Sequence, residues 1–524
     1  MKKSKAIRFI IGQLLLGKKD LNKIKKEASE KFKLKDMPKT SDIFRIFPKN
    51  KMDRETRKLL FRKPMRTASG VTPIAVMVKP EKSCRWNCIY CPIGNSLAPK
   101  SYTGYEPAAR RARSVGFNPK KQVETRLMHY GIQGHPTDKC EIIVMGGTFL
   151  NMPKKYQENF IKSIYDTLNG KRSVSLELAK TKNEKAKHRA IGLTLETRPD
   201  VCSEKNIADA LSYGATRMEL GVQHPDDKIY KKICRGHSVK EVAEATERLK
   251  DSGFKVCFHI MPGILGSDKK KDIGMMKKLF NDQRFKPDML KIYPTLVTKG
   301  TRLYDIYKKG KYSPYSAQEA SEVISEMYRH VPYYARIMRI QRDIPTNLLE
   351  AGVENSNLRE MVEKKAIEKR IEIKEIRFRE PKGNTGKTRM VLFRQDYKAS
   401  EGKEIFLSFE DEKRRSIFGF IRLRIPSRPF VPEIKEKTGL IRELHVYGME
   451  AEIGKEGYIQ HKGLGKRLLK EAERIAKKEF RMKRLAVISG VGAREYYYRL
   501  GYGKDGNYVS RSLFRKKASP KKRL

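Results

Sequence analysis

At 524 residues the chain is too long for one ordinary hydrophobic core, so we expect two to four domains. Lysine and arginine outnumber aspartate and glutamate by 115 to 61, which gives a net charge of +54 and an isoelectric point of about 10. Such an excess repels itself unless an anionic partner offsets it, and nucleic acid is a stronger candidate than an anionic membrane surface. A surface adapted to high salt or high temperature is the plainer alternative, but it does not explain so large an imbalance.

The N-terminal stretch is basic and has helical patterning. Residues 1–66 hold 22 basic against 7 acidic residues, a net charge of +15. The apolar run 6–16 has the spacing of an amphipathic helix, lacks a small-residue cleavage site and leads directly into Lys18 and Lys19. No apolar run in the chain approaches the roughly 18 residues that a membrane span needs. We therefore expect a cytoplasmic protein with no membrane partner, and a basic helical region over 1–66.

From about residue 73 short apolar runs alternate with helix-patterned segments. This order predicts parallel βα units that close into a partial barrel of the TIM type, a (β/α)6 arrangement in the α/β class. In such barrels the chemistry lies at the carboxyl ends of the strands. The six predicted strands are 73–78, 141–145, 190–196, 217–222, 254–260 and 289–293.

The remainder of the chain divides into a connector and a second module. Residues 315–375 have a charged, helical pattern. Beyond them, alternating apolar residues predict antiparallel strands at 389–397, 404–410, 416–425 and 441–448. A long amphipathic helix over 463–480, a strand over 485–489, a short tyrosine-rich helix and a basic tail over 511–524 complete an α+β module. We place the domain boundaries at 1–66, 67–314, 315–385 and 386–524.

Three of the seven cysteines cluster directly after the first barrel strand. Cys84, Cys88 and Cys91 can hold three irons of a [4Fe–4S] cube and leave the fourth iron open. A closed zinc site usually needs four protein ligands, and no further Cys or His follows at zinc-finger spacing. The other four cysteines lie scattered in apolar segments, where we expect buried, unreactive thiols: Cys140, Cys202, Cys234 and Cys257.

The spacing of these cysteines, with Tyr90 before the last of them, resembles the signature of the radical S-adenosylmethionine (SAM) superfamily. This resemblance implies that SAM chelates the open iron and is cleaved there to a deoxyadenosyl radical. The pair Gly146-Gly147, at the end of the second strand, resembles the family's glycine motif that meets the amino group of SAM. Two glycines after a strand are otherwise an ordinary turn.

A second candidate site precedes the long C-terminal helix. In Gln460-His-Lys-Gly463-Leu-Gly465 the glycines let backbone N–H groups face an anion at a helix N-terminus, which suits a pyrophosphate. With the preceding strand 443–446 and the tyrosines 496–498, this order resembles the GNAT acetyltransferases. In that family the loop holds the pyrophosphate of coenzyme A, and a tyrosine near the thioester sulfur can act as a general acid. Tyrosines on an amphipathic helix are otherwise core residues.

Several longer stretches resemble the catalytic subunit of Elongator, the tRNA wobble-uridine carboxymethyltransferase, over roughly residues 70–510. These stretches are Ser101–Pro107, Val144–Phe149, Leu195–Asp200, Lys291–Leu296, Gln341–Pro345, Arg442–Gly448 and Ala486–Gly492.

The resemblance implies the reaction and the residues that serve it. A SAM-derived radical takes hydrogen from the acetyl methyl group of acetyl-CoA, the carbon radical adds to the wobble uridine of a tRNA anticodon stem-loop, and thioester hydrolysis leaves a carboxymethyl group. By position, Cys84, Cys88 and Cys91 match the cluster ligands, and Gly146 and Gly147 match SAM contacts. Lys139, which this match places at the mouth of the barrel, and Tyr497 match catalytic residues. The acetyl-CoA contacts match Lys139, Glu443, Leu444, His445, Val446, Gly463, Leu464, Gly465, Lys466 and Tyr497.

Two departures from the family matter. Many relatives have a cysteine-containing zinc site in the connector, but residues 361–380 contain no Cys or His, so we expect packing and Lys–Glu ion pairs to hold the connector. The family's GVQS-type turn reads Gly221-Val-Gln-His224 in this chain.

Three other classes of function compete. The chain could be a different radical SAM enzyme with a substrate-binding appendage, a protein acetyltransferase with a structural iron–sulfur centre, or a basic RNA-binding scaffold. Each leaves at least one intact site without a use. The sequence leaves open the tRNA species, the reductant, and whether homo-oligomers or accessory subunits form.

Overall fold

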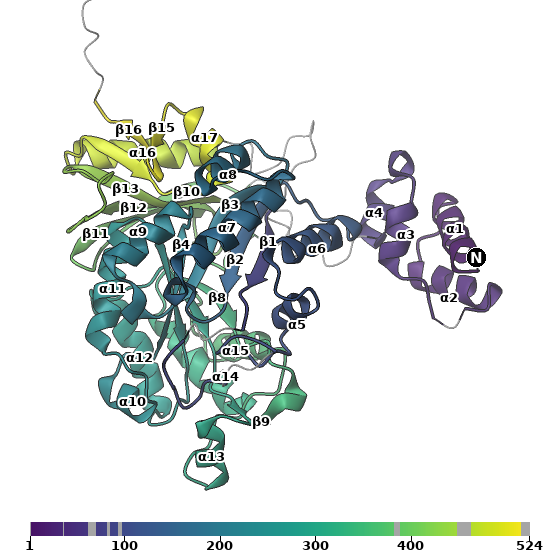
Figure 1. Cartoon of the computed structure of the whole chain (residues 1–524), viewed down its shortest axis with the longest axis horizontal. Coiled ribbons are helices and arrows are strands. Elements are labelled where there is room, and N and C mark those ends of the chain that lie inside the picture. The colour runs from purple at the N-terminus through teal and green to yellow at the C-terminus, as the bar shows by residue number, and fades with distance from the viewer. Residues whose placement is uncertain are drawn as a thin grey trace, which may run out of the picture.

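The computed structural model describes residues 2–34, 36–60, 70–80, 84–92, 97–381, 388–447 and 463–514. A group of N-terminal helices is followed by a curled parallel sheet with helices around it, and then by a second, mostly antiparallel sheet (Figure 1). The N-terminal helices lie to one side of the molecule, and the C-terminal sheet lies across one end of the parallel sheet. No helix among the described residues is long and apolar enough to cross a membrane.

The N-terminal helices have a small hydrophobic core of their own. Ile7, Ile10 and Leu14 of the first helix are buried against Ile24 and Phe47, which confirms the amphipathic helix expected over 6–16. The helices are α1 (Lys2–Leu15), α2 (Leu21–Lys31), α3 (Thr40–Ile46) and α4 (Arg54–Leu60).

The parallel sheet forms the half-barrel that the alternating pattern predicts. Its strands pair in parallel and in chain order, starting with the register Thr72↔Cys140. They are β1 (Thr72–Met77), β2 (Lys139–Met145), β3 (Arg189–Thr197), β4 (Arg217–Gln223), β5 (Lys255–Ile260), β6 (Met289–Ile292) and β8 (Arg336–Ile340). The helices around them are α5 (Pro107–Arg113), α6 (Pro119–Ile132), α7 (Lys154–Asn169), α8 (Leu176–Asn183), α9 (Glu204–Ser212), α10 (Asp227–Lys232), α11 (Val239–Asp251), α12 (Lys269–Asn281), α13 (Arg302–Lys308), α14 (Ala317–Met327) and α15 (Leu358–Glu368).

The expected six strands are joined by a seventh. Strand β8 lies inside the stretch 315–375 that we expected to be a helical connector, and it pairs with the open edge of β6. Its charged sequence Arg-Ile-Met-Arg-Ile has no continuous apolar run, so only the neighbouring strand identifies it as part of the sheet. The same stretch contributes β9 (Leu349–Ala351), which pairs with β7 (Val297–Thr298), and the helices α14 and α15, linked by the ion pair Lys369–Glu326 at 2.8 Å. An ion pair of the expected kind therefore does hold the connector.

The C-terminal sheet has the antiparallel order expected of the second module, with one parallel pair between β13 and β14. Its strands are β10 (Met390–Ala399), β11 (Gly402–Asp411), β12 (Ile417–Ile425), β13 (Thr438–Val446), β14 (Arg484–Val487), β15 (Gly503–Asp505) and β16 (Tyr508–Ser512). Helix α16 (Leu464–Lys478) buries Leu468, Ala472 and Ile475 against this sheet, and α17 (Arg494–Tyr498) is the tyrosine-rich helix.

The two sheets meet at the amino ends of the barrel strands. Arg442 of β13 donates to both carboxylate oxygens of Asp288, which directly precedes β6, at 2.7 and 2.6 Å. Arg424 of β12 pairs with Asp251 at 2.6 Å, and all four side chains are fully buried. The loop after β14 also touches the amino end of β3, where a Cβ atom on Gly490 would lie 2.0 Å from the carbonyl oxygen of Ile191. The second module therefore closes one end of the barrel and leaves the carboxyl ends of its strands for a site.

Candidate functional site

A cavity lies at the carboxyl ends of the barrel strands. The three clustered cysteines line it together with Gly147, which follows β2, and Thr197, which ends β3. The structure thus brings Cys84, Cys88 and Cys91 to one cavity, at the end of the barrel where the sequence predicts the chemistry.

The segment around Trp86 is held by cations from the barrel. Lys100 donates to the carbonyl oxygen of Trp86 at 2.7 Å, and the guanidinium of Arg198 lies over its ring, 3.9 Å from the centroid. A Cβ atom on Gly236, where φ is +74°, would lie 2.8 Å from the same ring, so only glycine lets the turn after α10 approach so closely.

The electrostatics of the cysteines suit a thiolate-bound cluster. Burial alone would raise the pKa of the Cys88 thiol, but the guanidinium groups of Arg235 and Arg198 outweigh burial and lower it. These groups lie 3.5 and 3.7 Å from its sulfur. Burial and the charge of Cys88 raise the pKa of Cys91 to about 12, so a cationic ligand is needed to hold that thiol ionised. Three thiols on one cavity, with fixed cations beside them, fit a cluster with one open iron.

The two glycines after β2 have different environments. A Cβ atom on Gly146 would lie 2.2 Å from the side chain of Val78, and one on Gly147 would lie 3.0 Å from the carbonyl oxygen of Lys100. Both have positive φ, at +146° and +75°. Gly147 lines the cavity, whereas Gly146 packs against β1 and its extension.

Sequence reasoning missed a set of charged residues that also line this cavity. Glu196 accepts a hydrogen bond from the hydroxyl of Tyr102 at 2.6 Å and lies 3.7 Å from the ammonium of Lys291. Lys291 also pairs with Glu219, which binds His259 at 2.8 Å. The available signal is the occurrence of ionisable residues at every second position of otherwise apolar strands, because such residues share one face of a strand.

The line of buried charge continues along the barrel interior toward the second module. Arg217 of β4 lies 2.5 Å from Glu141 and 3.2 Å from Glu219. At the amino ends of the strands, Glu443 of β13 pairs with Arg422 at 2.9 Å. Burial alone would raise the pKa of Glu443, but the charges of Arg422 and Lys255 outweigh burial and lower it. Branched apolar layers usually fill such a barrel, so this interior is unusually polar.

Four further predicted residues lie on β13, which borders the amino ends of the barrel strands: Glu443, Leu444, His445 and Val446. His445 stacks on Phe420 with ring centroids 5.8 Å apart, and burial lowers the pKa of its imidazole. Gly463 caps α16 with a φ of +67°, and a Cβ atom on Gly465 would lie 3.6 Å from the side chain of Val446. The start of α16 therefore lies beside the end of β13, as the predicted acetyl-CoA site requires.

The remaining predicted positions of this module differ in exposure. Lys466 is exposed, whereas the side chain of Leu464 is buried in the module core. Gln460, His461 and Lys462 lie outside the described residues, as do Gly448 and residues 515–524 of the predicted basic tail.

The predicted tyrosine is buried. Tyr497 packs edge-on against Tyr496 and Tyr502, with ring centroids 5.2 and 5.9 Å away, and burial raises the pKa of its hydroxyl. The hydroxyl of its neighbour Tyr496 approaches the first turn of α16, 2.8 Å from where a Cβ atom on Gly465 would lie.

Lys139 is the first residue of β2, at the amino ends of the strands. It pairs in register with Arg189, against which Gly492 of the second module packs closely. Met145, which lines the cavity, lies six positions beyond Lys139 along β2, about 20 Å of extended strand. We expected this lysine at the mouth of the barrel, and it lies at the end that the second module closes.

The scattered cysteines and His224 lie outside the lining of the cavity. Cys140, Cys202 and Cys257 are buried as predicted, but Cys234 is exposed, because it follows the short helix α10 in a surface turn with a positive φ of 53°. His224 is buried 3.9 Å from Asp272, and burial lowers the pKa of its imidazole to about 4.

Four family models match consecutive parts of the chain. They are the ELP3 N-terminal domain over residues 4–68, the Radical SAM superfamily over 79–279, the Radical SAM C-terminal domain over 287–368 and the Acetyltransferase (GNAT) family over 370–502.

Proteins of known name match the chain over most of its length. A "tRNA uridine(34) acetyltransferase" of Methanocaldococcus infernus is 45% identical and covers 98% of this chain and 100% of its own. One of Dehalococcoides mccartyi is 48% identical over 86% of this chain and 100% of its own. "Elongator complex protein 3" of Danio rerio is 38% identical over 94% and 93% of the two chains. The solved structure of "archaeal Methanocaldococcus infernus Elp3 with N-terminus deletion (1-46)" superposes with a TM-score of 0.76 at 43% identity and covers 85% of this chain and 100% of its own.

Proposed function

The chain belongs to the family of the tRNA uridine(34) acetyltransferases and Elongator complex protein 3, and from this premise we propose how its two modules share one reaction. It is an acyltransferase that modifies the wobble uridine of tRNA with a SAM-derived radical and acetyl-CoA, and it installs a carboxymethyl group. The observation that carries the proposal is the position of the two candidate sites at opposite ends of one barrel.

The half-barrel holds the iron–sulfur cluster and SAM. The radical SAM superfamily implies both, and the cluster supplies the electron that cleaves SAM when both are bound. Cys84, Cys88 and Cys91 are the ligands, and Arg198 and Arg235 stabilise the thiolate of Cys88. Gly147 gives SAM a close approach to the backbone, and Gly146 shapes the turn that presents it.

The C-terminal module holds acetyl-CoA. The GNAT family implies this cosubstrate. The first turn of α16, at Gly463, Leu464, Gly465 and Lys466, offers backbone N–H groups and positive charge to the pyrophosphate. We assign strand residues 443–446 to the pantetheine arm, and Tyr497 to the thioester sulfur while acetyl-CoA is held in this module.

Lys139 receives the arm of acetyl-CoA where it enters the barrel. Its position beside the second module suits a cation that holds a phosphate or the thioester carbonyl in a site shielded from water. We expect Lys139→Ala to keep the cluster and tRNA binding and to lose most tRNA-dependent release of free CoA. The matched control is Lys120→Ala on α6, which removes an exposed lysine. Release at the wild-type rate from Lys139→Ala would remove this residue from the mechanism.

The domain boundaries are part of the proposal. Residues 1–66 bind tRNA, 67–314 perform the radical chemistry, 315–385 connect the modules and 386–524 bind acetyl-CoA. The anticodon stem-loop is the bound part of the tRNA, and the cytoplasm is the expected compartment.

The test is mass spectrometry of tRNA nucleosides after anaerobic incubation with SAM, acetyl-CoA and a reductant. The wild-type chain, reconstituted to about four irons, produces carboxymethyluridine, and Cys88→Ser produces none and binds less iron. Cys234→Ser is the matched control, because it removes an exposed thiol that does not line the cavity. Full iron binding and activity in Cys88→Ser would overturn the assignment.

A further inference from the structure

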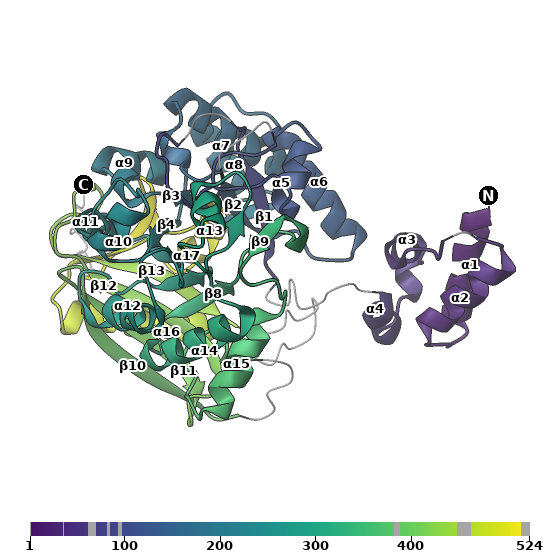
Figure 2. The same ribbon diagram turned by 90° about the horizontal axis from the view of Figure 1, so that it is seen from below.

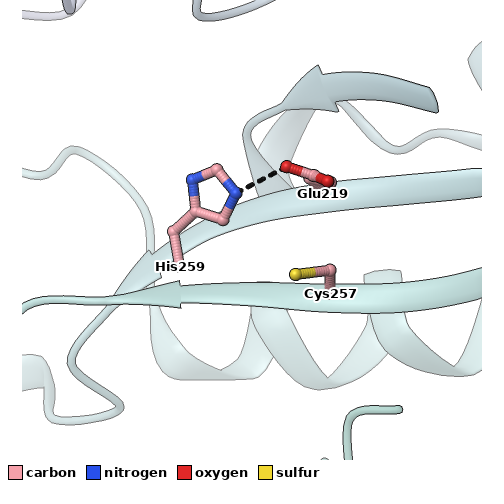
Figure 3. Close-up of side chains that lie close together, drawn as sticks. All are labelled: Glu219, Cys257 and His259. Atoms are coloured by element: carbon pink, nitrogen blue, oxygen red, sulfur yellow. Dashed lines mark hydrogen bonds and ion pairs between the residues drawn. The ribbon is translucent and has the colours of Figure 1, made fainter. Parts of the chain in front are cut away.

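His259 and Glu219 form a histidine–carboxylate pair on the wall of the cavity. The two residues lie on neighbouring strands, β5 and β4, and Nε2 of His259 lies 2.8 Å from Oε2 of Glu219 (Figure 3). The ring of Tyr293 packs edge-on against the imidazole, with centroids 5.5 Å apart and planes at 77°. The imidazole thus has a fixed orientation.

Glu219 is an ionised anchor for this histidine. Its side chain is fully buried, and both of its carboxylate oxygens face cations, Oε1 toward Arg217 and Oε2 toward Lys291. Burial alone would raise the pKa of Glu219, but Lys291, His259 and Arg217 hold it well below its ordinary value. A carboxylate next to Nε2 favours the tautomer with the proton on Nε2. The other ring nitrogen, Nδ1, then carries a lone pair, and Figure 3 shows it on the side of the ring that faces away from Glu219.

A metal site is the alternative use of these residues. Ligand atoms of Glu219, Cys257 and His259 lie within 4.8 Å of one another. However, burial and the charge of Glu219 raise the pKa of the Cys257 thiol, so the thiolate that a metal would bind is disfavoured. The cations on both oxygens of Glu219 also compete with a metal for the carboxylate. The arrangement therefore suits proton transfer better than metal binding.

The proposed function, on which this inference rests, creates a need for such a base in this cavity. The methyl carbon of the acetyl group must contact the SAM-derived radical at the cysteine cavity. The thioester carbonyl is one bond from that carbon. Once the acetyl arm has passed from the second module and Lys139 into the barrel, the carbonyl therefore lies in the same cavity, within the reach of a residue on its wall.

We propose that His259, oriented by Glu219, is the general base that activates water for hydrolysis of the thioester. Nδ1 accepts a proton from water as the water oxygen forms a bond to the carbonyl carbon. The carbon–sulfur bond then breaks, and His259 returns the proton to the sulfur of CoA. The products are the carboxylate, free CoA with its thiol, and one released proton, and no electron is transferred. Glu219 is a positioning residue, which stabilises the imidazolium formed in between.

The test separates hydrolysis from the radical step in the full-length, reconstituted protein. His259→Gln is incubated anaerobically with SAM, acetyl-CoA, a reductant and tRNA, and three products are followed: 5′-deoxyadenosine, carboxymethyluridine, and tRNA that carries CoA through a thioester. We expect 5′-deoxyadenosine to form within about threefold of the wild-type rate, carboxymethyluridine to fall about 100-fold or more, and the thioester adduct to accumulate. Mild alkali should release one CoA from each adduct.

Controls keep the outcomes distinct. His129→Gln on α6 changes a histidine outside the cavity and should behave as the wild type. Glu219→Gln should show the same accumulated adduct with a smaller loss, because the imidazole remains but its orientation is weakened. The inference is overturned if His259→Gln releases CoA and carboxymethyluridine at the wild-type rate, or if it loses 5′-deoxyadenosine formation while it stays folded with a full cluster. Absence of carboxymethyluridine from the wild-type reaction would instead overturn the proposed function.

Discussion

The N-terminal helices and the C-terminal module flank the same half-barrel, and both are rich in basic residues, but they are attached in opposite ways. The N-terminal helices have their own core and approach the barrel between α3 and α6 (Figure 2). There the ring of Phe44 lies against Gly134. The C-terminal module meets the barrel through fully buried arginines, among them Arg424 and Arg442, which pair with Asp251 and Asp288. The N-terminal helices thus carry exposed positive charge, whereas the arginines that join the C-terminal module to the barrel are buried and paired with carboxylates.

Positive charge has a different role in each of these two regions. A buried arginine must be neutralised by partners in the protein, because the cost of removing it from water is several kcal/mol. The charge of a buried arginine is therefore unavailable to a ligand, and replacement of that arginine lowers the stability of the fold. Lysines of α1 and α2 such as Lys5, Lys23 and Lys26 are exposed, so their charge remains available to a polyanion. We therefore expect their loss to affect tRNA binding rather than the fold.

The largest effect is expected from breaking the closed interface. Arg442→Met leaves Asp288 and Glu404 buried without their main cation, and the free energy of unfolding should fall by about 3–5 kcal/mol. Chemical denaturation measures the loss. Arg389→Met is the matched control, because Arg389 pairs with Glu412 on the surface and its loss should cost at most about 0.5 kcal/mol. A fall below about 1 kcal/mol in Arg442→Met would contradict the assigned role of the buried pairs.

A smaller effect is expected from removing the exposed charge. Deletion of residues 1–66 should weaken tRNA binding about tenfold or more at 0.1 M salt, which corresponds to about 1.4 kcal/mol or more. The dependence of log Kd on log salt should flatten, by about one for each lost phosphate contact. Unfolding of the remaining chain should be nearly unchanged, because the deleted helices have a separate core. An unchanged salt slope would show that these lysines only face solvent.

A milder version of the same experiment keeps the chain at full length. Replacing Lys5, Lys23 and Lys26 by glutamine should flatten the salt slope by up to about three, with stability within about 0.5 kcal/mol of the wild type. A fall in stability with no change in slope would reverse the roles that we give to the two regions.

The smallest change is expected from pH, because the closed interface resists titration. Burial alone would raise the pKa of Asp288, but Arg442, Lys250 and Arg422 hold it well below its usual value. A carboxyl group with a depressed folded pKa contributes stability above its unfolded pKa of about 3.9 and loses that contribution as pH falls through the folded value. The wild type should therefore be more stable than Asp288→Asn by an amount that changes by no more than about 0.5 kcal/mol between pH 8 and pH 5. Below about pH 4 this difference in unfolding free energy should become smaller. A difference that shrinks between pH 8 and pH 5 would contradict the depressed pKa.

Sequence patterns predicted the features that depend only on residues close together in the chain. The spacing of Cys84, Cys88 and Cys91 predicts a ligand set within one segment, and the apolar runs of β2 and β5 are long enough to predict buried strands. Strand β8 was not predicted, because its sequence Arg-Ile-Met-Arg-Ile has neither a long apolar run nor a regular alternation, and only the open edge of β6 makes it a strand.

The two modules, the cluster motif and the family could be predicted from sequence, because each depends on residues close together in the chain or on motifs in a fixed order. Which charges are paired and which face a cavity became apparent only in the folded chain. Arg442 and Lys5 are both basic residues in the sequence, yet Arg442 is buried in an ion pair with Asp288 and Lys5 is exposed to solvent. The pairing of His259 with Glu219 and the position of Lys139 at the closed end of the barrel were likewise decided by strand register. The physical reason is that the effect of a charge depends on its surroundings, which residues distant in the chain supply.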